Sequence, residues 1–266
     1  MPGDDVPQLD TGHAHPARVY NYWLGGTDNF AADREAAEQA IAANPGIKTD
    51  VRANRAFLAR VVRYLAGECG VRQFLDIGTG LPVAGNTHQV AQEIAPDARV
   101  VYADNDPIVL LHARALLTST PQGACDYVEA DLRDTAAIVR EAARTLDFGA
   151  PVALMLLIIL HLIPDADAPY GIVAELMGAL PPGSYLVLAH PASDIRAAQM
   201  AEMTRRVNAR MSGPAATMRD RAAITRFFDG LDLVEPGVVQ PQQWRPEPGM
   251  LSPPQVTAWC GVARKR

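Results

Sequence analysis

Two glycines and three aspartates are placed where loops would leave the ends of buried strands. The segment QFLDIGTG (73–80) runs from an apolar stretch through Asp76 into Gly78 and Gly80. Glycine lacks a Cβ and reaches positive φ freely, so this turn lets the backbone approach a ligand closely. Asp104 ends the next apolar stretch, at a spacing that suits hydrogen bonds from both hydroxyls of a ribose. Asp131 ends the third, where a carboxylate can accept a hydrogen bond from an adenine amino group.

The same turn distinguishes between kinds of nucleotide. In the pattern GxGxxG the third glycine lets a pyrophosphate meet backbone N–H groups, but here that position is Val83, preceded by Pro82. Both side chains crowd the place of a phosphate. A sulfonium nucleoside carries no phosphate, so the turn favours that class of ligand over a dinucleotide.

The elements that position these residues alternate between apolar runs of strand length and helical patterns. This alternation predicts an α/β fold with a parallel sheet covered on both faces. The run Val152–Leu160 is typical of a central strand, and Pro151 and Pro164 argue against the alternative of a buried helix. The predicted strands are 73–77, 99–104, 125–131, 151–160, 183–190, 232–240 and 255–265, and the helices between them are 88–95, 108–117, 136–146 and 170–180.

Three regions are expected along the chain. Residues 1–17 lack apolar periodicity and are expected to form a mobile tail, in which His13 and His15 are solvated. Residues 18–66 show helical spacing and predict an N-terminal helical cap of about three helices. Residues 67–266 then form the α/β domain, with further helices at about 195–228 that are interrupted by Gly213 and Pro214.

Composition excludes several classes of protein. The chain has 266 residues, is 48% hydrophobic and carries a net charge of −6, so its charge does not suit a nucleic-acid partner. The three cysteines are far apart and odd in number, which argues against disulfides and a zinc site, and we expect no metal. Without a signal-like start or a long apolar run, we expect no membrane partner and a cytoplasmic location.

Several segments carry a family resemblance. The turn Asp76-x-Gly78-x-Gly80-x-Pro82, with ADNDP (103–107), LIILHLIPD (157–165) and LPPGSYLVLAH (180–190), resembles the motifs of class I methyltransferases. More narrowly, ARVYNYWLGGTDNFAADREAA (17–37), RANRAFLARVVRYL (52–65), FLDIGTGLP (74–82) and QQWRP (242–246) resemble an actinobacterial family of S-adenosylmethionine-dependent methyltransferases, formerly catalogued as a domain of unknown function. The similarity spans about residues 16–263.

The resemblance implies a Rossmann-like, seven-stranded sheet with an antiparallel last hairpin, and S-adenosyl-L-methionine as methyl donor with S-adenosyl-L-homocysteine as product. It also implies a set of donor contacts: Gly78, Thr79 and Gly80 with the methionine part, Asp104 and Asn105 with the ribose and adenine edge, and Asp131 and Leu132 with the adenine. Asn86 and His88 are further donor candidates, and a helix cap and a surface imidazole are the competing interpretations.

The acceptor side is predicted from position. His161 follows the fourth strand, and its unperturbed pKa near ~6.5 suits a general base at neutral pH. The competing interpretation is that His161 takes no proton and serves only to pack or to orient the substrate. The segment VYNYWLGGTDNF (19–30) is rich in aromatic and polar groups, which either line a pocket or pack as core. From it we take Tyr20 and Asp28 as catalytic candidates, Asn29 as a donor contact, and Tyr22 and Trp23 as acceptor contacts.

Two further residues complete the candidate site. Arg55 offers a bidentate match to the donor carboxylate, unless it is a solvated surface residue. Met203 lies on a helix that mixes methionine with arginine and could cover an apolar acceptor, with core packing and a dimer face as alternatives.

The sequence leaves three functions open. The leading hypothesis is a methyltransferase acting on O, N or an electron-rich carbon of a small, natural-product-like acceptor. The alternatives are a protein that binds S-adenosylmethionine without transferring its methyl group, and a nicotinamide-dependent oxidoreductase. Whether the protein is a monomer or a homodimer is also open.

Overall fold

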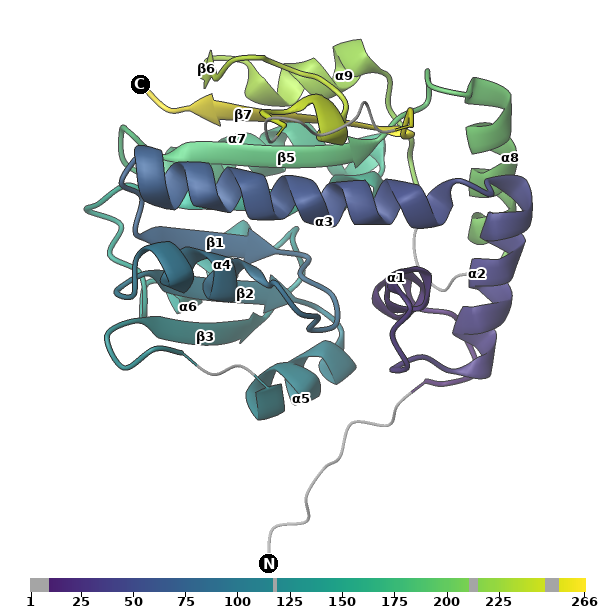
Figure 1. Ribbon diagram of the computed structural model, residues 1–266, viewed down its shortest axis with the longest axis horizontal. Coiled ribbons are helices and arrows are strands. Elements are labelled where there is room, and N and C mark those ends of the chain that lie inside the picture. The colour runs from purple at the N-terminus through teal and green to yellow at the C-terminus, as the bar shows by residue number, and fades with distance from the viewer. Residues whose placement is uncertain (1–9, 117–118, 211–214, 247–253) are drawn as a thin grey trace, which may run out of the picture.

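The computed structural model describes residues 10–116, 119–210, 215–246 and 254–266. Within these residues seven strands form one sheet in the order β3-β2-β1-β4-β5-β7-β6 (Figure 1). The first five pair in parallel, whereas β7 pairs antiparallel with both β5 and β6. This confirms the predicted Rossmann-like sheet and its antiparallel last hairpin. The strands are β1 (Gln73–Ile77), β2 (Arg99–Asp104), β3 (Ala124–Glu129), β4 (Ala153–Leu157), β5 (Tyr185–Pro191), β6 (Asp232–Leu233) and β7 (Ala258–Arg264).

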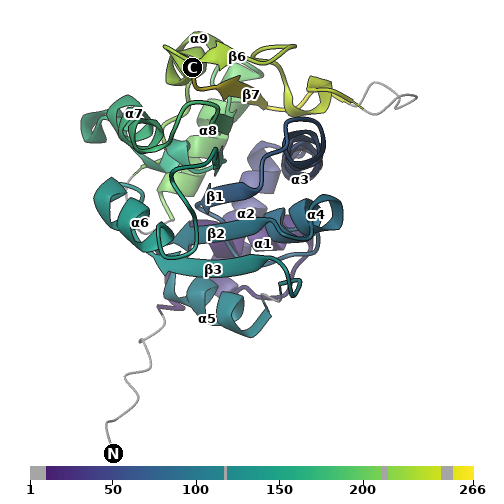
Figure 2. The same cartoon turned by 90° about the vertical axis from the view of Figure 1, so that its left-hand side faces the viewer.

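Helices cover both faces of this sheet (Figure 2). One face carries α6 and α7, and the other carries α3 and α4. None of the described helices has the length and apolar character needed to cross a membrane. The α-helices are α1 (Pro16–Leu24), α2 (Ala31–Ala43), α3 (Ile47–Arg63), α4 (Thr87–Ile94), α5 (Pro107–Leu116), α6 (Thr135–Ala142), α7 (Pro169–Ala179), α8 (Ala197–Asn208) and α9 (Arg221–Thr225).

The strands explain this layering because successive side chains point to opposite faces. In β1, Phe74 belongs to the apolar cluster beneath α3 and α4, whereas Leu75 and Ile77 belong to the cluster beneath α6 and α7. All five residues of β1 and of β4 are buried. A strand that is buried on both faces needs apolar residues at nearly every position, as the sequence of β4 shows.

Helix α3 departs from the expected division between cap and domain. Phe57, Leu58 and Val61 belong to the same apolar cluster as Phe74 and Met155 of the sheet. Figure 1 shows α3 lying across the sheet, while α1, α2 and α8 gather at the edge where the parallel strands end. The region 18–66 is therefore divided. Helices α1 and α2 form the cap, whereas α3 covers the sheet and contacts the cap at its first turn, where Ile47 packs with Ala40 of α2.

The apolar run 151–160 is not one continuous strand. β4 ends at Leu157, and Ile158 adopts φ 57°, which is rare for a β-branched residue. The Ile158 N–H still donates to the Ala189 carbonyl at 2.8 Å, and the chain then forms a short 3₁₀ helix at Leu160–Leu162. This abrupt turn keeps His161 at the edge of the sheet.

Other boundaries also differ from the sequence prediction. Ala14 is 1% exposed and α1 begins at Pro16, so the end of the expected tail is part of the folded cap. The last two strands are shorter than expected, and Val239 adds only an isolated bridge to Cys260. Residues 1–9 and the expected break at 213–214 lie outside the described residues.

A buried carboxylate joins α3 to the end of the sheet. Asp50 accepts hydrogen bonds from the Thr257 backbone N–H at 3.2 Å, from the Thr257 hydroxyl at 2.5 Å and from the Asn44 amide at 3.1 Å. Because Asp50 lies in the first turn of α3, the partial positive charge of the helix terminus also stabilises it. These contacts hold the cap against β7.

Replacing Asp50 by alanine should destabilise the protein, because it leaves the buried donors of Thr257 unpaired and removes the carboxylate partner of the Asn44 amide. We expect the free energy of unfolding, measured by urea denaturation, to fall by about 2–4 kcal/mol. Asp97→Ala is the control: Asp97 is a largely exposed partner of Arg72, and its removal should cost less than about 1 kcal/mol. Equal losses in the two variants would contradict the role of Asp50.

Candidate functional site

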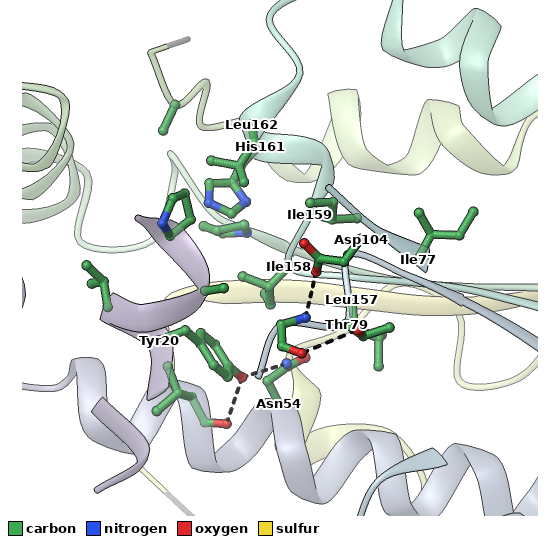
Figure 3. Close-up of a pocket in the computed structure, with 18 of the residues that line it drawn as sticks. Tyr20, Asn54, Ile77, Thr79, Asp104, Leu157, Ile158, Ile159, His161 and Leu162 are labelled. Atoms are coloured by element: carbon green, nitrogen blue, oxygen red, sulfur yellow. Dashed lines mark hydrogen bonds between the residues drawn. The ribbon is translucent and has the colours of Figure 1, made fainter. Parts of the chain in front are cut away.

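A cavity of about 520 Å³ lies at the edge where the parallel strands end, between the sheet and the cap (Figure 3). The loops after β1, β2, β3 and β4 line it, together with α1, α3 and α8. Most of the predicted site residues meet there. Its lining includes Tyr20, Trp23, Arg55, Asp76, Gly78, Thr79, Gly80, Asn86, Asp104, Asn105, Asp131, Leu132, His161 and Met203.

A buried carboxylate lies near the end of β1, just before the glycine-rich loop. Asp76 accepts a hydrogen bond from the Thr87 hydroxyl at 2.6 Å, and burial raises the pKa of Asp76 to about 6. Gly78 has φ 74°, and a Cβ at this position would lie 2.4 Å from Cγ1 of Ile159. Only glycine fits between these two loops, so the tight turn expected from the sequence is confirmed.

Asp104 connects this loop to the end of β2. Its Oδ2 accepts a hydrogen bond from the Gly80 N–H at 2.8 Å, and its Oδ1 accepts one from the Asp106 N–H at 3.0 Å. Burial raises the pKa of Asp104, while the two N–H donors oppose this effect. The side chain is thus held at the cavity by its own backbone neighbours.

Asp131 is placed as expected but is already paired. Arg133 donates to Asp131 at 2.7 Å and holds the pKa of that carboxyl below its usual range. The Asn105 amide also donates to it, at 3.4 Å, and the adjoining Leu132 is buried. This part of the lining therefore combines an apolar surface with a polar rim.

These residues fit an adenosyl sulfonium ligand. Asp104 offers carboxylate oxygens to ribose hydroxyls, Leu132 offers apolar contact to a base, and Asp76 offers negative charge to an amino group. The side chain of Tyr127 also lines the cavity, and its hydroxyl is buried.

His15 contributes to the cavity, which the sequence did not predict. Its Nδ1 lies 2.9 Å from Oδ2 of Asp106, and its backbone N–H donates to Asp33 at 2.8 Å. The expectation of a solvated tail histidine is therefore wrong for His15. The sequence signal was the position of His15 immediately before Pro16, which begins α1.

Helix α3 presents a second polar group that the sequence analysis missed. Asn54 of α3 donates to the Tyr20 hydroxyl at 3.0 Å, and the Tyr20 hydroxyl lies 3.4 Å from the Val51 carbonyl (Figure 3). The Oδ1 atom of Asn54 is buried without a partner. Its signal was the four-residue spacing from Asp50, which places two polar residues on the buried face of α3.

Arg55 of α3 forms hydrogen bonds with the glycine-rich loop that ends at Asn86. Arg55 donates to the Gly85 carbonyl at 2.8 Å and lies 3.3 Å from Oδ1 of Asn86. Asn86 stands at the N-cap of α4, as one of the two interpretations predicted. Arg55 is therefore not a free surface residue, and its contacts fix the loop that borders the cavity.

Four candidates have other surroundings, and none of them is among the cavity-lining residues. The Tyr22 hydroxyl donates to Glu38 at 2.5 Å, and the Asn29 amide donates to Asn21 at 3.0 Å. Asp28 lies 3.9 Å from His112. His88 is buried against the Tyr102 hydroxyl at 2.8 Å, so the competing interpretation of a surface imidazole is wrong.

His161 lines the cavity, but its electrostatic environment differs from the expectation. Burial, assisted by the charge of Arg219, lowers the pKa of His161 to about 4. The ring is therefore neutral at pH 7 and is a weaker base than its ordinary pKa suggested. Arg219 holds the turn that carries this ring by donating to the carbonyls of Leu160 at 3.0 Å and Ile163 at 2.9 Å.

The family is established by sequence comparison. A model of the S-adenosyl methyltransferase family matches residues 3–266. The chain belongs to this family. The match decides between the two enzyme hypotheses, because it supports methyl transfer and not nicotinamide chemistry.

Two solved structures resemble this methyltransferase along nearly its whole length. A DUF574 family protein from Streptomyces avermitilis is 43% identical, with a TM-score of 0.93 and coverage of 97% of this chain and 99% of its own. A proposed methyltransferase from Thermobifida fusca is 42% identical, with a TM-score of 0.88 and 98% coverage of both chains. These likenesses confirm the predicted resemblance to the narrower family.

A more distant likeness concerns the fold alone. The plantazolicin methyltransferase BpumL, solved with a pentazolic desmethylPZN analogue and SAH, is 10% identical with a TM-score of 0.55, and the match covers 94% of this chain and 96% of BpumL. No curated protein is significantly similar to the chain.

Asp76→Asn should stabilise the ligand-free methyltransferase above pH 6. The Asp76 carboxyl ionises near pH 4 in the unfolded chain and near pH 6 in the folded one, so the wild type loses stability as the pH rises between these values. The amide avoids this penalty and can still accept the Thr87 hydroxyl. We expect a gain of about 2 kcal/mol at pH 7 in urea denaturation, which disappears towards pH 4. A loss of stability at pH 7 would contradict this view of Asp76.

Proposed function

We propose that this methyltransferase binds S-adenosylmethionine against the loops after β1, β2 and β3 and transfers its methyl group to a small acceptor beneath the cap. The observation that carries the proposal is the continuity of one cavity from Asp104 and Gly80 to Met203 of α8. Donor and acceptor could meet there without solvent between them. The acceptor atom is O, N or an electron-rich carbon.

On the donor side, each residue acts by contact or by charge. Gly78, Thr79 and Gly80 form the backbone surface for the methionine part, and Asp76 attracts its amino group. Asp104 and Asn105 receive the ribose, and Leu132 packs against the adenine. Arg55 acts indirectly in this proposal, since its guanidinium already holds the carbonyl of Gly85.

The bound donor supplies an electrophilic methyl group on a sulfonium. The protein must then align the acceptor atom with the methyl–sulfur bond and exclude water. Such orientation alone can supply an effective molarity of ~10⁵ M or more. Tyr20 and Trp23 of α1 line the cavity together with residues of α8, and they provide this enclosure.

A natural product is the acceptor class that we favour, because the narrower family resembled by the sequence is actinobacterial. The net charge of −6 also disfavours a nucleic-acid acceptor. A protein that binds the donor without methyl transfer is the alternative, but no contact in the cavity specifically favours it.

Calorimetric titration with S-adenosylhomocysteine tests the donor site. The wild type should bind it, whereas Asp104→Ala should bind about 10- to 100-fold more weakly, because hydrogen bonds to a charged group contribute about 1.5–3 kcal/mol. NAD should not bind to either protein. Asp229→Ala is the control, because Asp229 is exposed and does not line the cavity.

Unfolding transitions of the variants show whether each is folded, and Asp104→Asn provides a second variant that keeps one acceptor oxygen. Unchanged affinity in both Asp104 variants would remove Asp104 from the donor site. Binding of NAD instead of S-adenosylhomocysteine would overturn the proposed function.

A further inference from the structure

The half of the cavity beneath α8 has an apolar lining. Ala40, Ile47, Met200, Met203 and Val207 form one buried cluster, and Trp23 and Met218 pack against it. We call the cavity-lining members Trp23, Ile47, Met200, Met203, Val207 and Met218 the acceptor chamber. Methionine adapts its shape to an irregular apolar partner, so this surface suits a hydrophobic molecule.

The polar groups on the same helix and its neighbouring loop are already paired. The Thr204 hydroxyl donates to the Met200 carbonyl at 2.8 Å. Asn208 accepts the Ala216 N–H at 2.9 Å. Both side chains line the cavity, yet their hydrogen-bonding groups hold α8 and the segment after it in place.

The charged groups around the cavity are also partnered. Arg133 lies 3.0 Å from Asp167 as well as pairing with Asp131, and Arg55 is bound to loop carbonyls. Asp50 is surrounded by three donors on Thr257 and Asn44. A charged acceptor would have to compete for these contacts, and an unpaired charge is expensive to bury.

His161 differs from these groups. Its Nδ1 is buried without a hydrogen-bond partner, while its backbone is fixed because the Thr217 N–H donates to its carbonyl at 2.7 Å. The neighbouring His190 is fully occupied, with Nδ1 2.8 Å from the Pro191 carbonyl and Nε2 3.0 Å from Arg219. Figure 3 shows His161 and Asn54 on opposite sides of Ile158, so His161 lies away from the Tyr20–Asn54 pair.

We infer that the acceptor is an uncharged, largely apolar hydroxyl compound, and that its O–H donates a hydrogen bond to the imidazole of His161. This inference rests on the proposed methyl transfer and names the acceptor class for the same cavity. The chamber supplies hydrophobic contact, and the ring supplies the polar contact that orients the reacting oxygen.

The transfer balances with this assignment. A lone pair of the acceptor oxygen forms the new O–C bond, and the S–C bond breaks with its electron pair remaining on sulfur. The oxygen then gives its proton to the neutral imidazole, which passes it to water. A protonated ether is a much stronger acid than an imidazolium, so even a weakly basic ring can take this proton. A protonated amine, with a pKa near ~10, would not give it up.

Four naphthalenes of similar size test the inference by calorimetry on the full chain saturated with S-adenosylhomocysteine. They are 2-naphthol, 2-methoxynaphthalene, the anion 2-naphthoate and the cation 2-(aminomethyl)naphthalene. We expect 2-naphthol to bind about 5- to 10-fold more tightly than its methyl ether, as one net hydrogen bond predicts. Both ions should bind at least about 10-fold more weakly than 2-naphthol.

Variants of His161 separate its role from general packing. In His161→Phe the preference for 2-naphthol over the ether should disappear, whereas His161→Asn, which keeps an acceptor atom near the position of Nδ1, should restore part of it. Val207→Ala is the matched control, because it enlarges the chamber and should weaken both ligands alike. Binding of S-adenosylhomocysteine shows that each variant is folded.

Three results would overturn the inference while leaving the donor site intact. They are binding of S-adenosylhomocysteine without binding of any naphthalene, tightest binding of an ion, and an unchanged preference for 2-naphthol in His161→Phe. Failure of the wild type to bind S-adenosylhomocysteine would instead contradict the proposed function itself.

Discussion

The hydrogen bonds to Asp104 set the relative positions of the loops that form the cavity. One carboxylate oxygen holds Gly80 after β1, and the other holds Asp106 after β2. Asp106 in turn lies 2.9 Å from His15, at the start of α1. Two buried carboxylates, those of Asp104 and Asp106, thus connect the sheet edge to the helix that carries Tyr20, so the shape of the donor half and the placement of the cap depend on neighbouring contacts.

The contacts that shape the site also lower the stability of the ligand-free protein, because they bury carboxylates and strain the backbone. Burial raises the pKa of both Asp76 and Asp104, which shows that their charged forms are less stable here than in water. Ile158 adds a strained backbone in the wall of the cavity. A positively charged ligand would offset the first penalty, because it stabilises the carboxylates that burial destabilises. These costs therefore support a binding role for this edge of the sheet.

Much of the donor half could be predicted from the sequence, because its residues lie at the ends of strands or shortly after them. The apolar run before Asp76 fixes the end of β1, and the parallel neighbours then bring Asp104 and Asp131 to the same edge. The roles of His15 and Asn54 could not be predicted in this way. His15 depends on Asp106, and Asn54 on Tyr20, and both contacts join segments whose separation in space is set by the packing of α1 and α3.

The acceptor half of the cavity is positioned by side-chain packing between helices, which explains why the sequence predicted it less well than the donor half. Its walls come from α1 and α8, whose positions depend on side-chain packing around Met200 and Met203 rather than on the hydrogen bonds of the sheet. The low pKa of His161 likewise depends first on its burial and then on the charge of Arg219, which is distant in sequence. Changes among the methionines can therefore reshape the acceptor chamber while Asp104 keeps the donor loops in place, because the two halves are stabilised by separate sets of contacts.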